Sequence, residues 1–188
     1  YAVAGDKIAA HRDGCAYLDK MYRKPIDQRA DIVLVSQGGA PKDLNLYQTQ
    51  KALDNARHAV RPGGVIILIG SCKEGLGEHV FEEWLISAEK PQDLVERIQR
   101  EFRLGGHKAA AIAMALEHAE IYLVSDLEPE FVKTLFMTPF ATVQEMDRTL
   151  IENWNRCVKD GDTVLATARD SIASYCARLY VKGGEKNE

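Results

Sequence analysis

Hydrophobic residues in this chain form short unbroken runs, separated by longer stretches in which apolar residues recur every three to four positions. Four runs of β-branched and aliphatic residues predict strands, at residues 31–36, 65–69, 121–125 and 163–168. The runs do not alternate with polar residues, which is the pattern of strands that are covered on both faces.

Helical spacing connects these strands. It predicts helices at residues 6–22, 45–60, 78–87, 91–102, 107–117 and 142–157, the last with Thr142 as its N-cap, and a turn at residues 61–64. Alternation of strands and helices implies parallel strands joined by crossovers. The expected fold is therefore a three-layer α/β sandwich with a mostly parallel, Rossmann-like sheet. Residues 1–188 are expected to form this single domain, with a flexible polar tail at residues 182–188.

Charge and hydropathy exclude two classes of partner. The formal net charge is −4, and Lys and Arg do not cluster locally, which argues against binding to nucleic acid. The longest apolar run, Val65–Ile69, is far too short to cross a membrane. The chain starts at Tyr1 without an initiator Met, which favours a cut point inside a longer polypeptide or a processed terminus.

Cysteines and histidines show no metal-binding spacing. The four cysteines lack a C-x-x-C pair, and the histidines lack i, i+4 pairs and an H-E-x-x-H motif. We therefore expect no metal site in this chain, and reduced thiols in a cytoplasmic protein. The cysteines are Cys15, Cys72, Cys157 and Cys176.

Two glycine-rich loops follow predicted strands, at residues 36–42 and 70–77. In open α/β sheets, ligands bind where such loops connect strand ends to helix starts. Glycine lets the backbone approach a ligand and adopt positive φ. The candidate binding-loop residues are Gly38, Gly39, Gly75 and Gly77. The alternative reading of these glycines is ordinary turn formation.

The predicted helix at residues 45–60 has two distinct faces. One face is expected to pack on the sheet and consists of Leu46, Thr49, Leu53, Ala56 and Val60. Gln48 and Lys51 fall on nearly the opposite face, with Tyr47 beside them. A phenol, an amide and an ammonium group can together hold a carboxylate or a phosphate, and the helix dipole favours an anion at the same end. The alternative is a solvated polar face.

The sequence does not match two common nucleotide-binding motifs. The loop at residues 70–77 lacks the Gly-Lys-Ser/Thr of a P-loop. The turn at residues 61–64 resembles one in S-adenosylmethionine-dependent methyltransferases, but no G-x-G-x-x-G follows a predicted strand.

A longer pattern spans residues 38–51, Gly-Gly-Ala-Pro-Lys-Asp-Leu-Asn-Leu-Tyr-Gln-Thr-Gln-Lys. It resembles the Gly-Gly-x-Pro-x-Asp-x-Asn-x-Tyr-Gln-x-x-Lys segment of the nickel-dependent lactate racemase family of 2-hydroxy acid racemases and epimerases. Flanking residues are similar as well, at positions 4–15, 63–69, 75–81 and 124–127. The resemblance extends from Ala4 to about Ala168.

The resemblance implies the carboxy-terminal domain of a two-domain isomerase. It implies that the amino-terminal domain of the same polypeptide binds a nickel-pincer nucleotide cofactor and carries the catalytic residues. The implied reaction is reversible hydride transfer at Cα of a small 2-hydroxy acid. The present chain is then expected to hold no cofactor of its own and to be inactive alone.

Substrate-binding residues follow from the same resemblance. Gln48 and Lys51 match the family's substrate-contacting Gln and Lys, and Tyr47 matches its pocket-wall Tyr. At the start of a later helix, His107 stands where lactate enzymes have a Trp, which favours a larger or more polar 2-hydroxy acid. Two alternatives remain open from the residues alone: a stand-alone α/β module that binds an anionic metabolite, and a methyltransferase-like domain.

Overall fold

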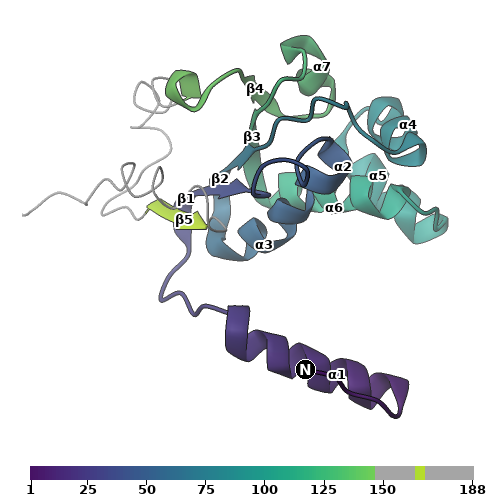
Figure 1. The fold of residues 1–188 in the computed structure, drawn as a ribbon. Helices are drawn as coiled ribbons and strands as arrows, with labels where there is room; N and C mark the ends of the chain where they lie inside the picture. Colours follow the sequence, from purple (N-terminus) through teal and green to yellow (C-terminus); the bar gives the residue numbers. More distant parts are fainter. Residues whose placement is uncertain (147–163, 168–188) are drawn as a thin grey trace, which may run out of the picture.

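The computed structural model describes residues 1–146 and 164–167 and contains a five-stranded sheet in the order β4-β3-β2-β1-β5 (Figure 1). Each pair of neighbouring strands is parallel. The predicted α/β class with a parallel sheet is confirmed. The strands are β1 (Ala30–Ser36), β2 (Val60–Ile69), β3 (Ala119–Val124), β4 (Thr138–Phe140) and β5 (Val164–Thr167).

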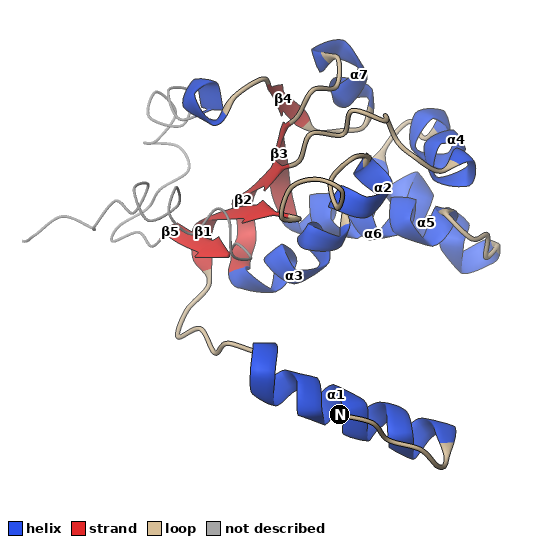
Figure 2. Cartoon of the chain, in the orientation of Figure 1, coloured by secondary structure: helices blue, strands red, loops and turns tan. Residues whose placement is uncertain are grey.

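Successive residues of each central strand enter opposite cores. In β1, Val33 and Val35 belong to a core covered by helices, whereas Ile32 and Leu34 belong to a core on the other face. This burial of both faces explains why the strands read as continuous apolar runs. Helices α3 (Lys51–Ala59) and α6 (Gly106–His118) pack on the first face, and α4 (His79–Ser87) and α5 (Pro91–Arg100) pack on α6 (Figure 2).

On the second face, the described residues that pack outside the strands come from the segment that follows β4. Val143 and Met146 pack there against Phe140 and the strand residues of that face. A helical turn occupies residues 143–146, and the Thr142 hydroxyl accepts a hydrogen bond from the Glu145 backbone at 3.1 Å. The predicted N-cap is therefore confirmed. The rest of the predicted helix at 142–157 and the tail at 182–188 lie outside the described residues.

The predicted turn at residues 61–64 lies inside β2 as a bulge. Ala30 pairs with Val60, and Ile32 pairs with Val65, so the intervening residues of β2 loop out of the register. A side chain at Gly64 would place its Cβ 2.6 Å from the Asp31 carbonyl oxygen, which explains the glycine. Gly63 adopts a φ of +72°, which glycine accommodates without strain.

Two elements were not predicted, namely α7 (Pro129–Thr134) and β4. The helix has six residues and buries only Val132, so it leaves almost no periodic signal. The three-residue strand contains Pro139, which normally argues against a strand. Proline is tolerated here because β4 is the edge strand of the sheet.

Helix α1 (Lys7–Tyr22) forms as predicted but stands apart from the sheet (Figure 1). The Asp6 carboxylate accepts hydrogen bonds from the backbone of Ile8 and Ala9, which caps the helix. None of its residues is buried. Within the described part of the chain, no helix is long and apolar enough to span a membrane.

Candidate functional site

The polar residues singled out from the sequence lie on a short helix, α2 (Leu46–Thr49), and at the start of α3. The single helix predicted over residues 45–60 is therefore wrong in one respect, because it is interrupted at Gln50. The Gln50 amide donates to the carbonyls of both Gln48 and Leu46, so the hydrogen-bond pattern is locally tightened. Gln50 keeps right-handed helical angles, φ −54° and ψ −26°, and the interruption preserves the helical arrangement of the faces.

The two predicted faces are present. The apolar face is buried at Leu46, Thr49, Leu53, Ala56 and Val60, although Val60 already belongs to β2. On the other side, Tyr47 and Gln48 are half-buried and Lys51 is exposed. The Lys51 ammonium donates a hydrogen bond of 2.5 Å to Gln48 Oε1. The structure thus brings the predicted amide and cation into contact on an accessible surface.

The second glycine loop, residues 70–77, holds the start of α2. The carbonyls of Gly75 and Leu76 accept hydrogen bonds from the amides of Leu46 and Tyr47, at 3.0 and 3.1 Å. The next amide, that of Gln48, is capped by Asn45 Oδ1 at 3.1 Å. These amides already have partners in the protein. Anion binding at this point must therefore rely on side chains, and the expected contribution of the helix start is not available.

The four candidate loop glycines all adopt positive φ: Gly38 at 101°, Gly39 at 73°, Gly75 at 71° and Gly77 at 86°. A Cβ at Gly77 would lie 2.3 Å from Asn45 Cγ, so this glycine is explained by packing against the cap of α2. Gly39 and Gly75 have open space where a Cβ would be. A ligand-binding role for these loops stays a prediction.

A buried polar layer supports the loop from below. Asp43 is buried and accepts a hydrogen bond from the Ser71 amide at 3.1 Å. Cys72 has a φ of +49°, and its thiol donates to Thr49 Oγ1 at 3.6 Å. Burial raises the pKa of Cys72 to about 11. This layer orders the chain between β2 and α2, and its thiol is held in the protonated form.

His107, predicted as a substrate-binding residue, lies half-buried at the second position of α6. Its Nδ1 accepts a hydrogen bond from the Gly105 amide at 3.3 Å, and its ring stacks on Phe102 with 5.9 Å between centroids. In the described residues, His107 makes no recorded hydrogen bond or ring contact with Tyr47, Gln48 or Lys51. Its role in substrate binding also stays a prediction.

The neighbouring residue, Lys108, was missed by the sequence analysis. Its ammonium donates to the Tyr47 carbonyl oxygen at 2.8 Å and lies 3.7 Å from the centroid of the Tyr47 ring. The other ring contact of Tyr47 is edge-to-face with buried Phe81, at 5.4 Å and 79°. The resemblance pointed to the helix start at residues 105–108, but it gave no reason to single out Lys108 beside His107.

Tyr47, Gln48, Lys51 and Lys108, hereafter the Tyr47 cluster, carry an excess of positive charge. Burial lowers the pKa of Lys108, the charge of Lys51 lowers it further, and the carboxylate of Asp54 raises it. In the part of the chain that is described, neither Lys51 nor Lys108 has a carboxylate oxygen within 4.0 Å. The cluster is therefore suited to bind an anion supplied from outside.

Comparison with known proteins gives the family. The family model described as the lactate racemase C-terminal domain matches residues 26–168. The chain belongs to this family. The match includes the Tyr47 cluster and the whole described sheet, and it starts after α1. Membership also argues against the methyltransferase alternative.

Two curated relatives named lactate racemase are similar to this chain. The protein from Thermoanaerobacterium thermosaccharolyticum is 34% identical over 146 residues, which cover 73% of this chain and 33% of the relative. The protein from Lactiplantibacillus plantarum is 30% identical over 148 residues, which cover 76% of this chain and 34% of the relative. The chain thus spans about a third of the length of these relatives.

A solved structure of a lactate racemase is similar to this chain as well. The lactate racemase apoprotein from Thermoanaerobacterium thermosaccharolyticum superposes with a TM-score of 0.72 at 28% sequence identity, covering 86% of this chain and 40% of that one. A Thermotoga maritima protein reaches a TM-score of 0.56 at 12% identity, which supports the fold alone.

Proposed function

We propose that this chain is the substrate-binding domain of a 2-hydroxy acid racemase or epimerase that works with a nickel-pincer nucleotide. The observation that carries the proposal is the contact between Lys51 and Gln48 on an accessible surface. A 2-hydroxy acid presents a carboxylate, and a cation with an adjacent amide is a suitable pair of donors for it.

The hydrogen-bonding capacity of the pair supports this role. An ammonium group has three donors, and Lys51 uses one of them on Gln48 Oε1. Because that bond takes up the amide oxygen, the Gln48 NH2 group points its two donors elsewhere. Four N–H groups are therefore left for the oxygens of a bound acid. Tyr47 lies on the same side of the helix as Lys51, four residues earlier, and provides an aromatic wall.

The described residues do not fit a nickel centre. Throughout residues 1–146 and 164–167, no group of three or more His, Cys, Asp or Glu side chains could hold a metal ion. We propose, as the family resemblance implies, that the amino-terminal domain of the same polypeptide holds the cofactor and the catalytic residues; this chain spans about a third of the length of the curated relatives. The role of this chain is to bind and orient the acid, and by itself it is expected to be inactive.

Closure of the amino-terminal domain over the Tyr47 cluster completes the proposed site. Lys51 is open to water in the present structure, where an exposed charged contact is weak. Exclusion of water strengthens the same contact and protects a hydride transfer from side reactions. We propose a cytoplasmic location, because the spacing of the four cysteines is not that of a disulfide framework.

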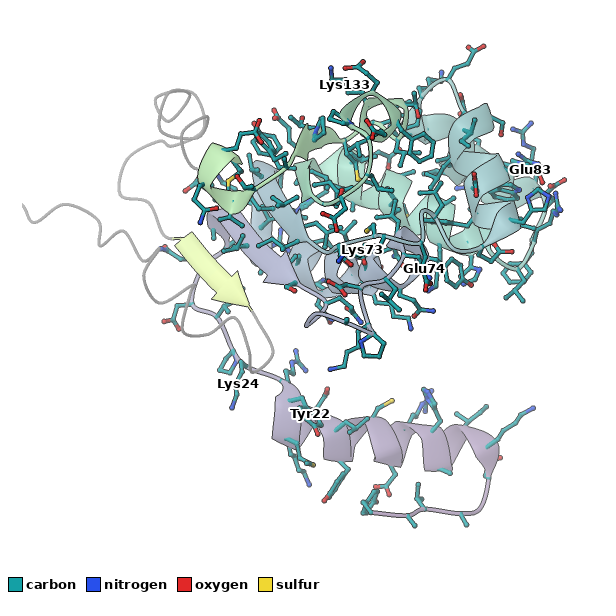
Figure 3. The ribbon with its side chains drawn as sticks, turned by 45° about the horizontal axis from the view of Figure 1, so that its top comes forward. Tyr22, Lys24, Lys73, Glu74, Glu83 and Lys133 are labelled. Atoms are coloured by element: carbon teal, nitrogen blue, oxygen red, sulfur yellow. The ribbon has the colours of Figure 1, made fainter. Side chains whose placement is uncertain are left out.

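The test uses the full-length protein loaded with its cofactor. Lys51→Met removes the charge and keeps the apolar stem, and we expect kcat/KM for a 2-hydroxy acid to fall by roughly 30-fold to several thousand-fold, equivalent to about 2–5 kcal/mol. The matched control is Lys133→Met. Lys133 is exposed on α7 (Figure 3), and its recorded ion pair is with Glu130 of the same helix, not with a residue of the cluster. Its exposed ion pair contributes little, so activity should stay within about twofold of wild type.

Two results would contradict the proposal. Normal kinetics in Lys51→Met would remove this residue from the site. Failure of the loaded full-length protein to interconvert the enantiomers or epimers of any 2-hydroxy acid would reject the racemase function itself.

A further inference from the structure

The position of Lys108 is the strongest feature that the proposed function leaves unexplained. Its ammonium lies over the ring of Tyr47 and is bonded to the carbonyl of the same residue. Tyr47 and Lys51 are four residues apart on the helical path, so they lie on the same side of it. Lys108 therefore reaches Tyr47 from α6, and Lys51 lies one turn further along the helical path, at the start of α3.

Two ammonium groups whose charges act on each other are unfavourable without an anion. Lys108 is half-buried, and the charge of Lys51 acts on it in the same direction as burial does. Asp54 is close enough to act on Lys108, but its oxygens do not come within 4.0 Å of either lysine. The described protein therefore does not neutralise the pair by itself.

Lys108 also has N–H groups that remain available for a ligand. One of its three N–H groups donates to the Tyr47 carbonyl oxygen, and its positive charge makes a cation–π contact with the face of the Tyr47 ring. If Lys108 served only to support Tyr47, the nearby charge of Lys51 would not be needed. The arrangement offers one cation for each of two anionic groups, with Lys108 against the face of the Tyr47 ring.

We propose that Lys108 is a specificity-determining residue that binds a second carboxylate of the substrate, so that the preferred substrate is a short 2-hydroxy dicarboxylic acid. This inference rests on the proposed racemase function. Lys51 and Gln48 hold the carboxylate next to the hydroxyl-bearing carbon, and Lys108 holds the distal one. A monocarboxylic acid leaves Lys108 without an anionic partner, which is unfavourable in a closed site.

The experiment compares malate and lactate as probes of the loaded full-length protein. Wild type is expected to have the higher kcat/KM for malate. Lys108→Met is expected to lose about 10- to 100-fold on malate, the effect of one hydrogen bond to a charged group, and less than about threefold on lactate. Lys108→Arg keeps the charge and should retain a preference for malate, and Lys133→Met should change neither substrate.

The outcomes separate this inference from the proposed function. Equal losses on both acids in Lys108→Met would show that Lys108 only supports Tyr47, and would overturn the inference. If the wild-type protein racemises lactate but not malate, the inference about Lys108 is wrong. The proposed racemase function would still hold. Interconversion of neither of these acids, nor of any other 2-hydroxy acid, would remove both.

Discussion

The contact between Gly106 and Trp84 fixes the start of α6 and gives a sharp prediction of stability. A Cβ at Gly106 would lie 2.7 to 2.8 Å from three ring atoms of Trp84, which is fully buried on α4. Ordinary van der Waals contact begins at 3.4 Å, so Gly106→Ala requires the ring or the helix to move by more than half an ångström. Overpacking of this kind costs about 1–3 kcal/mol.

Helix propensity opposes that cost. Alanine is favoured over glycine in a helix by at most about 1 kcal/mol. The net expectation for Gly106→Ala is a loss of roughly 1–2 kcal/mol of unfolding free energy, seen as a urea midpoint lower by about 0.5 M or more. Far-UV circular dichroism across a urea titration measures it.

The matched control is Gly14→Ala in α1. Both glycines lie in helices with ordinary φ, but a Cβ at Gly14 meets no atom within 4 Å. This variant should gain helix content without a lower midpoint. A Gly106→Ala protein as stable as the Gly14→Ala protein would refute the packing argument. It would mean that Trp84 does not hold α6 in the position that brings Lys108 to Tyr47.

Two other features make predictions. Burial raises the pKa of Cys72 to about 11, so its thiol should resist iodoacetamide at pH 8 while exposed Cys15 reacts, as mass spectrometry of the labelled native protein would show. The folded state holds the thiol proton more tightly than the unfolded state does. The resulting contribution to the unfolding free energy is therefore present below the pKa of the unfolded thiol and is lost as the pH rises toward 11. A Cys72→Ser protein that loses the same amount of unfolding free energy at alkaline pH would contradict this. Gly77→Ala combines a φ of 86° with a Cβ 2.3 Å from Asn45 Cγ, and we expect a loss of about 2 kcal/mol or more in thermal or urea unfolding. A stability equal to wild type would show that Asn45 is free to move.

Most of the sheet could be predicted because its central strands are buried on both faces. Ile66 and Ile67 of β2 enter opposite cores, so both are apolar, and the run is visible in the sequence. The same argument fails at β4, where a proline sits in a three-residue edge strand. It also fails at Gln50, where the helix is interrupted without a glycine or proline to mark it.

The candidate site could be predicted only in part. Gln48 and Lys51 are three residues apart, and helical geometry alone predicts their contact. Lys108 reaches Tyr47 across 61 positions of sequence, through the packing of α6 on α4, and no local pattern contains that information. The glycines of the second loop have positive φ as expected, but the protein uses the neighbouring carbonyls to hold α2.

The way in which the second loop holds α2 has a consequence for protein engineering. Its hydrogen bonds come from the main-chain carbonyls of Gly75 and Leu76, and the Glu74 amide is bonded to the Leu44 carbonyl. The side chains of Lys73 and Glu74 are exposed at the surface of this loop (Figure 3) and take no part in those bonds. Their charges can therefore be exchanged to tune how fast anionic acids are drawn to the surface, while the orientation of the binding helix is left intact.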